Sequence, residues 1–187
     1  MARVITVVMR MKTSDNALAR AAAGGDRDAF SCLIARHYDR VFGLAFRLSG
    51  RREEAEDLCQ DVFAALPVKL RAFRADARFS TWMYRVVVNA SHDRRRRAMV
   101  HARAAVSWGE VELARRAEAE EAAMAMDWLQ RAMSELPEDL RDTMALVLDD
   151  DVTHAAAGEV LGVSEGTISW RVSEVKKRLR AMKEAEA

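Results

Sequence analysis

Apolar residues recur at steps of three and four positions over several stretches of the chain, a spacing typical of amphipathic helices. The clearest stretch runs from Asp26 to Leu48, where Asp26 can cap the first turn and Ser49-Gly50 can end the last. Its apolar face consists of Phe30, Leu33, Ile34, Tyr38, Val41, Phe42, Ala45 and Leu48. We therefore expect a long helix over this stretch.

The same periodicity predicts a second helix over 53–66 and a third from Ser80 to about Met99. Pro67 should kink or end the second helix, because proline lacks the amide hydrogen that a helix interior uses. Residues 68–78 are basic and lack a clear period, so we expect an irregular loop there.

Helical patterns return from Ala122, with a break at Pro137. A turn is predicted at Asp149–Asp151, followed by helices over about 153–161 and 164–183. The prediction is an all-α protein with two small helical domains joined by a flexible linker. The parts are a disordered leader (1–12), a first domain (13–97), the linker (98–121) and a second domain (122–187).

Composition narrows the function classes. With 2 prolines, 8 glycines and 6% aromatic residues, the chain lacks the turns and β-branched alternation of a sandwich or barrel. Cys32 and Cys59 show no CxxC spacing, the four histidines are scattered, and no nucleophile has a paired base. We therefore expect no metal, no cofactor and no enzymatic activity. No apolar run reaches the length of a membrane span and no signal peptide is recognisable, so we expect a cytoplasmic protein without membrane insertion.

Charge is distributed unevenly, although the net charge is only +1. Residues 13–97 carry 16 basic and 11 acidic residues, whereas residues 104–151 carry 4 basic and 13 acidic residues. Basic side chains gather at Arg94–Arg97 and again between Arg171 and Lys183. Two basic patches separated by an acidic stretch are typical of a protein that contacts one polyanion twice, although solvated helix ends would give the same charges.

The carboxy-terminal helices carry a helix-turn-helix pattern. Thr153 can cap a short helix, Gly162 can adopt a left-handed backbone in the turn, and Ser164 can cap the next helix. Such a helix enters the major groove of DNA, although an ordinary helical hairpin is the alternative. The residues offered to DNA are Ser164, Thr167, Ser169, Trp170, Arg171, Ser173, Glu174, Lys176, Lys177 and Arg178.

The helix that begins at Ser80 has two different faces. One is an apolar stripe that consists of Trp82, Met83, Val86 and Ala90. The other is polar and basic and consists of Arg85, Asn89, Asp93 and Arg96, and it ends in the basic run Arg94, Arg95, Arg96 and Arg97. Asparagine can donate to and accept from a base edge, and arginine neutralises phosphates. We interpret this face as a second DNA contact; the alternative is a plain amphipathic surface helix.

Two groups of residues resemble a known family. Glu56–Phe63 and Phe79–Val86, followed by Asn89 and the arginine run, are similar to the second region of extracytoplasmic-function (ECF) sigma factors of bacterial RNA polymerase. Leu161–Ile168 and the following basic residues are similar to the fourth region. The resemblance covers about residues 14–97 and 122–182, in family order.

The resemblance implies a transcription initiation factor that binds RNA polymerase core and directs it to promoter DNA. Asp57, Gln60 and Asp61 match the positions that dock on the clamp helices of the largest core subunit. The positions that read the minus-ten element, and that hold a base flipped from the duplex, are matched by Arg78, Phe79, Ser80, Asn89 and Asp93. The helix-turn-helix would read the minus-thirty-five element. An anti-sigma factor is an expected partner, and the free protein is expected to be a monomer.

The fourth region departs from the family pattern. Ala155–Gly158 replace an acidic pair and a larger aliphatic residue, and Gly158 lowers intrinsic helix stability by about 1 kcal/mol relative to alanine. Trp170 and Glu174 stand where small and basic residues are usual. We therefore expect an unusual minus-thirty-five sequence and a weak fourth domain. The alternative function is a helix-turn-helix regulator with a helical dimerisation domain, which leaves residues 53–97 unexplained.

Overall fold

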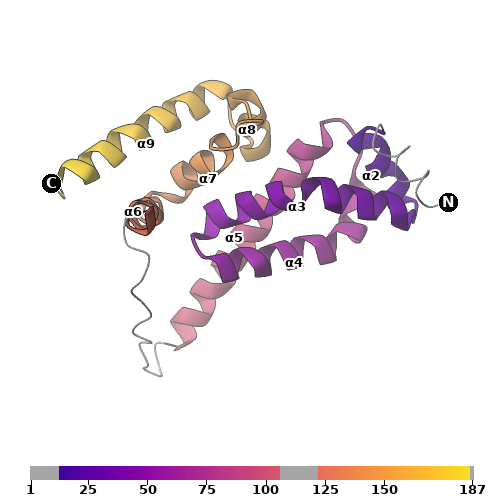
Figure 1. Cartoon of the computed structure of the whole chain (residues 1–187), viewed down its shortest axis with the longest axis horizontal. Coiled ribbons are helices and arrows are strands. Elements are labelled where there is room, and N and C mark those ends of the chain that lie inside the picture. The colour runs from indigo at the N-terminus through magenta and orange to yellow at the C-terminus, as the bar shows by residue number, and fades with distance from the viewer. Residues whose placement is uncertain (1–12, 106–121, 186–187) are drawn as a thin grey trace.

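The computed structural model describes residues 13–105 and 122–185, and every regular element in these two ranges is a helix (Figure 1). The first group of helices comprises α2 (Asp15–Ala23), α3 (Arg27–Ser49), α4 (Arg52–Lys69), the 3-10 turn η1 (Leu70–Ala72) and α5 (Phe79–Ala105). The second group comprises α6 (Ala122–Glu135), α7 (Glu138–Val147), α8 (His154–Leu161) and α9 (Glu165–Ala185). The predicted all-α fold with two helical domains is confirmed.

Helix α3 lies at the centre of the first group and contacts α2, α4 and α5 (Figure 1). The predicted cap and stop of this helix are confirmed. The Asp26 carboxylate accepts from the amides of Asp28 and Ala29, both at 3.0 Å, and Gly50 ends the helix with φ +74°. Leu33 and Val41 are fully buried, so most of the predicted apolar face packs into the core of this group, but Tyr38 is 45% exposed and lies outside it.

Pro67 was predicted to kink or end the second helix, and the structure shows that α4 does not end there. It continues to Lys69, with Pro67 inside its last turn. A proline within a helix costs roughly 3 kcal/mol. Leu66 and Leu70 on either side of it are fully buried, and each buried leucine contributes about 1.5–3 kcal/mol. Packing therefore offsets the lost hydrogen bond, and the helix continues past Pro67 and is followed directly by η1.

Helix α5 is longer than the pattern predicts. It begins at Phe79 and runs to Ala105, so residues 98–105, predicted as the first part of the linker, are helical. The β-branched run Val86–Val88 has a weak helix propensity, and its burial explains why it is helical here. The predicted leader (1–12) and the rest of the linker (106–121) lie outside the described residues.

The turn between α8 and α9 forms as predicted. The Thr153 hydroxyl accepts from the Ala156 amide at 3.1 Å, Gly162 has φ +70°, and the Ser164 hydroxyl accepts from the Thr167 amide at 3.1 Å. Gly158 lowers the helix propensity of α8, but it also allows α8 to pack closely against the turn. A Cβ atom there would lie 2.7 Å from the carbonyl oxygen of Val163, so only glycine lets α8 approach the turn this closely.

The two groups of helices pack directly on each other, which the sequence did not predict. Helix α5 contacts α8, and α3 contacts α7, so the groups lie side by side in Figure 1. Leu146 and Val160 of the second group belong to the same buried apolar cluster as Val87 of the first. We call this packing the closed arrangement. No helix within the described ranges is both long and apolar enough to cross a bilayer.

Polar contacts reinforce the closed arrangement. The Arg47 guanidinium donates to the Ala145 carbonyl at 2.6 Å and lies 3.6 Å from the Asp149 carboxylate. The Tyr84 hydroxyl donates to Asp149 at 3.2 Å. Burial, assisted by this carboxylate, raises the pKa of Tyr84 to about 12, so the hydroxyl keeps its proton and remains a donor. The two domains are therefore joined by directional bonds as well as by apolar contact.

Candidate functional site

The carboxylates expected to dock on polymerase lie on the exposed face of α4. Asp57, Gln60 and Asp61 occupy positions i, i+3 and i+4 of this helix and are all exposed. Arg94 reaches them from α5, with its guanidinium nitrogens 2.6 Å from Asp61 and 3.1 Å from Asp57. The helix therefore presents two carboxylates in a spacing that one guanidinium can bridge. Arginines of a partner surface could bind the same pair.

The polar face of α5 is divided between solvent and the second domain. Asn89, Arg96 and Arg97 are exposed, and Arg96 is paired with Asp93 at 2.8 Å. Arg85 is exposed as well, but it donates to the carbonyl of Glu159 in α8. The closed arrangement thus occupies part of the face that we predicted to contact DNA.

Arg95, which we predicted to contact phosphates, forms ion pairs with the second domain instead. One guanidinium nitrogen lies 3.1 Å from both Asp142 and Glu138 of α7. Its Nε and its other terminal nitrogen are buried and make no hydrogen bond. The second domain therefore provides partners for only one of the three guanidinium nitrogens of Arg95. The other two have no hydrogen-bond partner while the two domains are packed together in the closed arrangement.

Asn16 of α2 holds the loop before α5, and sequence reasoning missed it. Its side-chain nitrogen donates to the Ala77 carbonyl at 3.2 Å, and its side-chain oxygen accepts from the Phe79 amide at 2.8 Å. One amide group therefore fixes both ends of the segment that carries Arg78, which is exposed, and precedes Ser80, which is half-buried. The sequence analysis predicted no helix over Asp15–Ala23, so no local signal pointed to Asn16.

Phe79 does not contribute its side chain to the DNA surface, which corrects our prediction. It is only 1% exposed and packs edge-on against His37 and Phe73, with ring centroids 5.0 and 5.7 Å apart. Trp82 lies on the outer side of the same aromatic cluster. Burial lowers the pKa of His37, while the Asp15 carboxylate, 3.0 Å from Nε2, acts in the opposite direction. Phe79 supports the loop from within the core.

The helix-turn-helix presents most, but not all, of the predicted residues on α9. Ser164, Ser169, Trp170, Ser173, Lys176, Lys177 and Arg178 are exposed. Trp170 is 60% exposed, and Ser169 is hydrogen-bonded to His154 at 3.0 Å. Arg178 donates to Glu174 at 2.8 Å and thereby lowers the pKa of that carboxyl.

Arg171 is the exception on this helix. It turns toward α7, where its guanidinium lies 3.3 Å from Asp139, and its side chain is only 16% exposed. In this arrangement Arg171 joins α9 to α7 and is not available to DNA. The sequence placed Arg171 on the outer face, but its long side chain reaches back to α7, and helical spacing alone does not show this.

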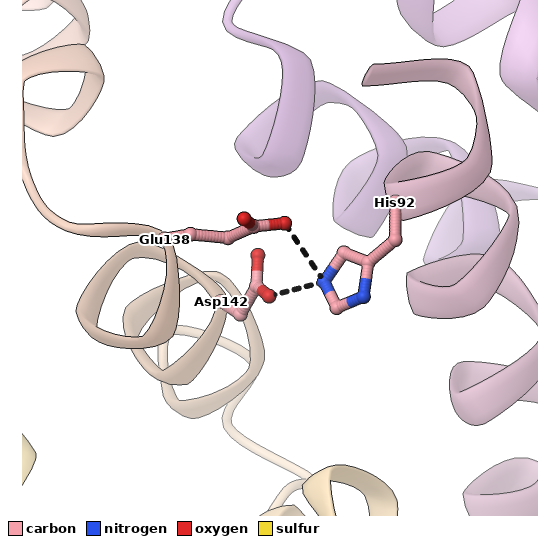
Figure 2. A group of neighbouring side chains, drawn as sticks. All are labelled: His92, Glu138 and Asp142. Atoms are coloured by element: carbon pink, nitrogen blue, oxygen red, sulfur yellow. Dashed lines mark hydrogen bonds and ion pairs between the residues drawn. The ribbon is translucent and has the colours of Figure 1, made fainter. Parts of the chain in front are cut away.

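A further cluster forms where the domains meet. His92 of α5 points toward Glu138 and Asp142 of α7 (Figure 2). Nε2 of His92 lies 2.5 Å from Asp142 and 3.5 Å from Glu138. Sequence reasoning could not find this group, because His92 is separated from Asp142 by 50 positions and only the closed arrangement brings them together.

Comparisons with known proteins agree with both halves of the fold. The family described as Sigma-70 region 2 matches residues 33–100, and Sigma-70, region 4 matches residues 132–181. The ECF RNA polymerase sigma factor SigM of Mycobacterium tuberculosis is 36% identical over 170 residues, which cover 91% of this chain and 85% of SigM. SigW of Bacillus subtilis is 28% identical over 167 residues, which cover 83% of this chain and 89% of SigW.

The fold also resembles a solved structure of CnrH in complex with the cytosolic domain of CnrY. The TM-score is 0.70 at 24% identity, covering 92% of this chain and 99% of CnrH. The match of the first domain disfavours the alternative of a helix-turn-helix regulator with an unrelated dimerisation domain. Sigma factors are initiation factors rather than enzymes. The resemblance seen in the sequence is therefore confirmed, and the chain belongs to the ECF sigma factors of RNA polymerase.

Proposed function

We propose that this sigma factor docks on the core enzyme through Asp57, Gln60 and Asp61. The observation that carries this proposal is the bridging of Asp57 and Asp61 by Arg94. This ion pairing supports the proposal because it indicates that the spacing of the Asp57 and Asp61 carboxylates suits binding of a guanidinium. Both carboxylates remain exposed on α4. The clamp helices of the largest core subunit would present arginines to the same carboxylates.

The promoter contacts follow from the exposed parts of α5 and α9. Arg78, Ser80, Asn89, Asp93 and the arginines of α5 would read and hold the minus-ten element. The minus-thirty-five element would be bound by Ser164, Thr167, Ser169, Trp170, Ser173, Glu174, Lys176, Lys177 and Arg178. Because α7 and α8 occupy Arg95 and Arg85 in the closed arrangement, full contact with the minus-ten element requires the domains to separate.

Control by an anti-sigma factor fits this chain as well. CnrH was solved with the cytosolic domain of CnrY, and another similar fold, RpoE of Bartonella quintana, with the anti-sigma factor NepR. An anti-sigma factor that stabilised the closed arrangement would keep Arg85 and Arg95 of α5 in contact with the second domain. In this proposal the protein acts in the cytoplasm, without chemistry of its own and as a monomer before it meets the polymerase.

The docking assignment is tested by replacing Asp57 and Asp61 together with arginine. Core binding, measured by co-elution in size-exclusion chromatography, and run-off transcription should both be lost, while the helix content seen by circular dichroism stays the same. Glu53→Arg is the matched control, because Glu53 lies on the same helix and is also exposed. Retained transcription by the double variant would refute the assignment.

A further inference from the structure

The cluster of His92, Glu138 and Asp142 has the composition of a metal site. Each residue offers one ligand atom, and these atoms lie within 4.8 Å of one another. Tetrahedral zinc, with bonds of about 2.0–2.1 Å, keeps its ligand atoms about 3.3 Å apart. Glu138 already lies 3.5 Å from Nε2 of His92, and Asp142 at 2.5 Å needs to retreat by only about 0.8 Å. Glu138 is half-exposed, so its side chain can adjust.

The electrostatics of the cluster also favour a cation. The Asp142 side chain is 3% exposed, and a buried carboxylate is costly unless it is compensated. The guanidinium of Arg95 is in ion-pair contact with both carboxylates, and that of Arg141 lies near enough to interact with both, while His92 contributes no charge when it is neutral. Because Arg95 is the guanidinium in contact with both carboxylates, a bound ion would add a second positive charge at contact distance.

Arg95 leaves one oxygen of Asp142 open for the ion, whereas on Glu138 it contacts Oε1, the same oxygen that lies 3.5 Å from His92, so Glu138 must turn or share this oxygen to bind a metal. Arg95 binds Oδ1 of Asp142, whereas Oδ2 faces His92. A donor that holds the far oxygen of a ligating carboxylate fixes its orientation, which is the usual arrangement around protein metal sites. Figure 2 shows both carboxylates and the imidazole converging from two different helices. The contacts on the far side of Asp142 therefore orient it toward the imidazole.

We propose that His92, Glu138 and Asp142 bind Zn²⁺ between the two domains, with water as the fourth ligand. An imidazole beside two carboxylates suits zinc, whereas Mg²⁺ and Ca²⁺ prefer ligand sets made of oxygen alone. The ligands come from α5 and α7, so the complete site exists only in the closed arrangement. Zinc thus favours the closed over the open arrangement, by about 100-fold when its free concentration is 100 times its dissociation constant.

The proposal is tested by calorimetric titration of the metal-free full-length chain with ZnCl₂. One zinc per chain should bind, and an excess of Mg²⁺ should not displace it. Both His92→Ala and Glu138→Gln should weaken binding by at least about tenfold. The matched controls are His154→Ala and Asp139→Asn, which remove an imidazole and a neighbouring carboxylate outside the cluster and should leave the affinity unchanged. Both changed ligands are partly exposed, so these variants should fold, which circular dichroism checks.

A second measurement reports on the site itself. The ring resonances of His92 in the NMR spectrum should shift with one equivalent of zinc. Energy transfer between a dye on each domain should rise on addition of zinc and fall again with chelator. Absence of zinc binding would overturn the proposal, as would binding that survives His92→Ala, which would point to Cys32 or Cys59 instead. All these measurements use the free chain without polymerase, so their failure leaves the proposed sigma-factor function intact.

Discussion

Replacing Gly158 with alanine tests the closest backbone approach in the helix-turn-helix. On helix propensity alone, this change should stabilise α8 by about 0.8–1.0 kcal/mol. The new Cβ atom would, however, lie 2.7 Å from the carbonyl oxygen of Val163, and 3.5 Å from the backbone of Ser164 and Glu165. Ordinary contacts begin at 3.4 Å, so the turn must move by several tenths of an ångström.

The clash outweighs the propensity gain because the atoms it meets belong to backbone. Overpacking of this kind costs about 1–3 kcal/mol. The Val163 amide also donates to the Gly158 carbonyl at 3.0 Å, so the turn cannot retreat without straining that bond. We expect a net loss of about 1 kcal/mol in the free energy of unfolding, or a Tm lower by roughly 2–4 °C.

The measurement is urea unfolding of the purified chain followed by circular dichroism. Gly166→Ala is the matched control, because it adds the same methyl group to a neighbouring helix where the nearest side chain, Ser164, is 3.8 Å away. That variant should be at least as stable as the native chain. If Gly158→Ala were as stable as Gly166→Ala, the reasoning about the close approach would be wrong.

Three further predictions concern the first domain. Asn16→Ala removes both hydrogen bonds to the loop before α5, so transcription from a given minus-ten element should fall severalfold while core binding is unchanged; equal losses in both would indicate misfolding instead. Because burial lowers the pKa of His37, the unfolded chain takes up a proton more readily, so stability should decline as the pH falls below about 6.5. His37→Phe should flatten that decline in urea titrations at several pH values, and an unchanged slope would exclude His37 as its source. Asn89→Ala should reduce open-complex formation more than core binding, as measured by footprinting and co-elution.

Features set by a few neighbouring residues could be predicted from the sequence. The cap at Asp26, the stop at Gly50 and the turn at Gly162 each depend on a local bond or backbone angle, and all three form as expected. The family resemblance was found in the same way, from contiguous motifs. Pro67 shows the limit of local reasoning, since the burial of its neighbours decides the outcome.

Features set by contacts between distant residues could not be predicted. The bonds of Asn16 span more than 60 positions, and those of His92 join two domains whose packing has no sequence signature. Phe79 and Arg171 were placed by helical spacing or family position, which do not tell whether a side chain meets the core or a neighbouring helix. Site residues that depend on tertiary packing therefore needed the structure.

The bridge between α4 and α5 has a consequence for the order of assembly. A core enzyme that takes over the carboxylates of Asp57 and Asp61 releases the guanidinium of Arg94. That group would then stand free on α5, the helix that we propose contacts the promoter. Arginines of the core enzyme would replace Arg94 as the partners of Asp57 and Asp61, so the number of ion pairs on α4 stays nearly constant. The affinity of docking through these carboxylates should therefore depend only weakly on salt concentration. If the proposed docking and promoter contacts are right, the same exchange adds one cation to the proposed DNA surface, and binding of the core enzyme should strengthen DNA binding.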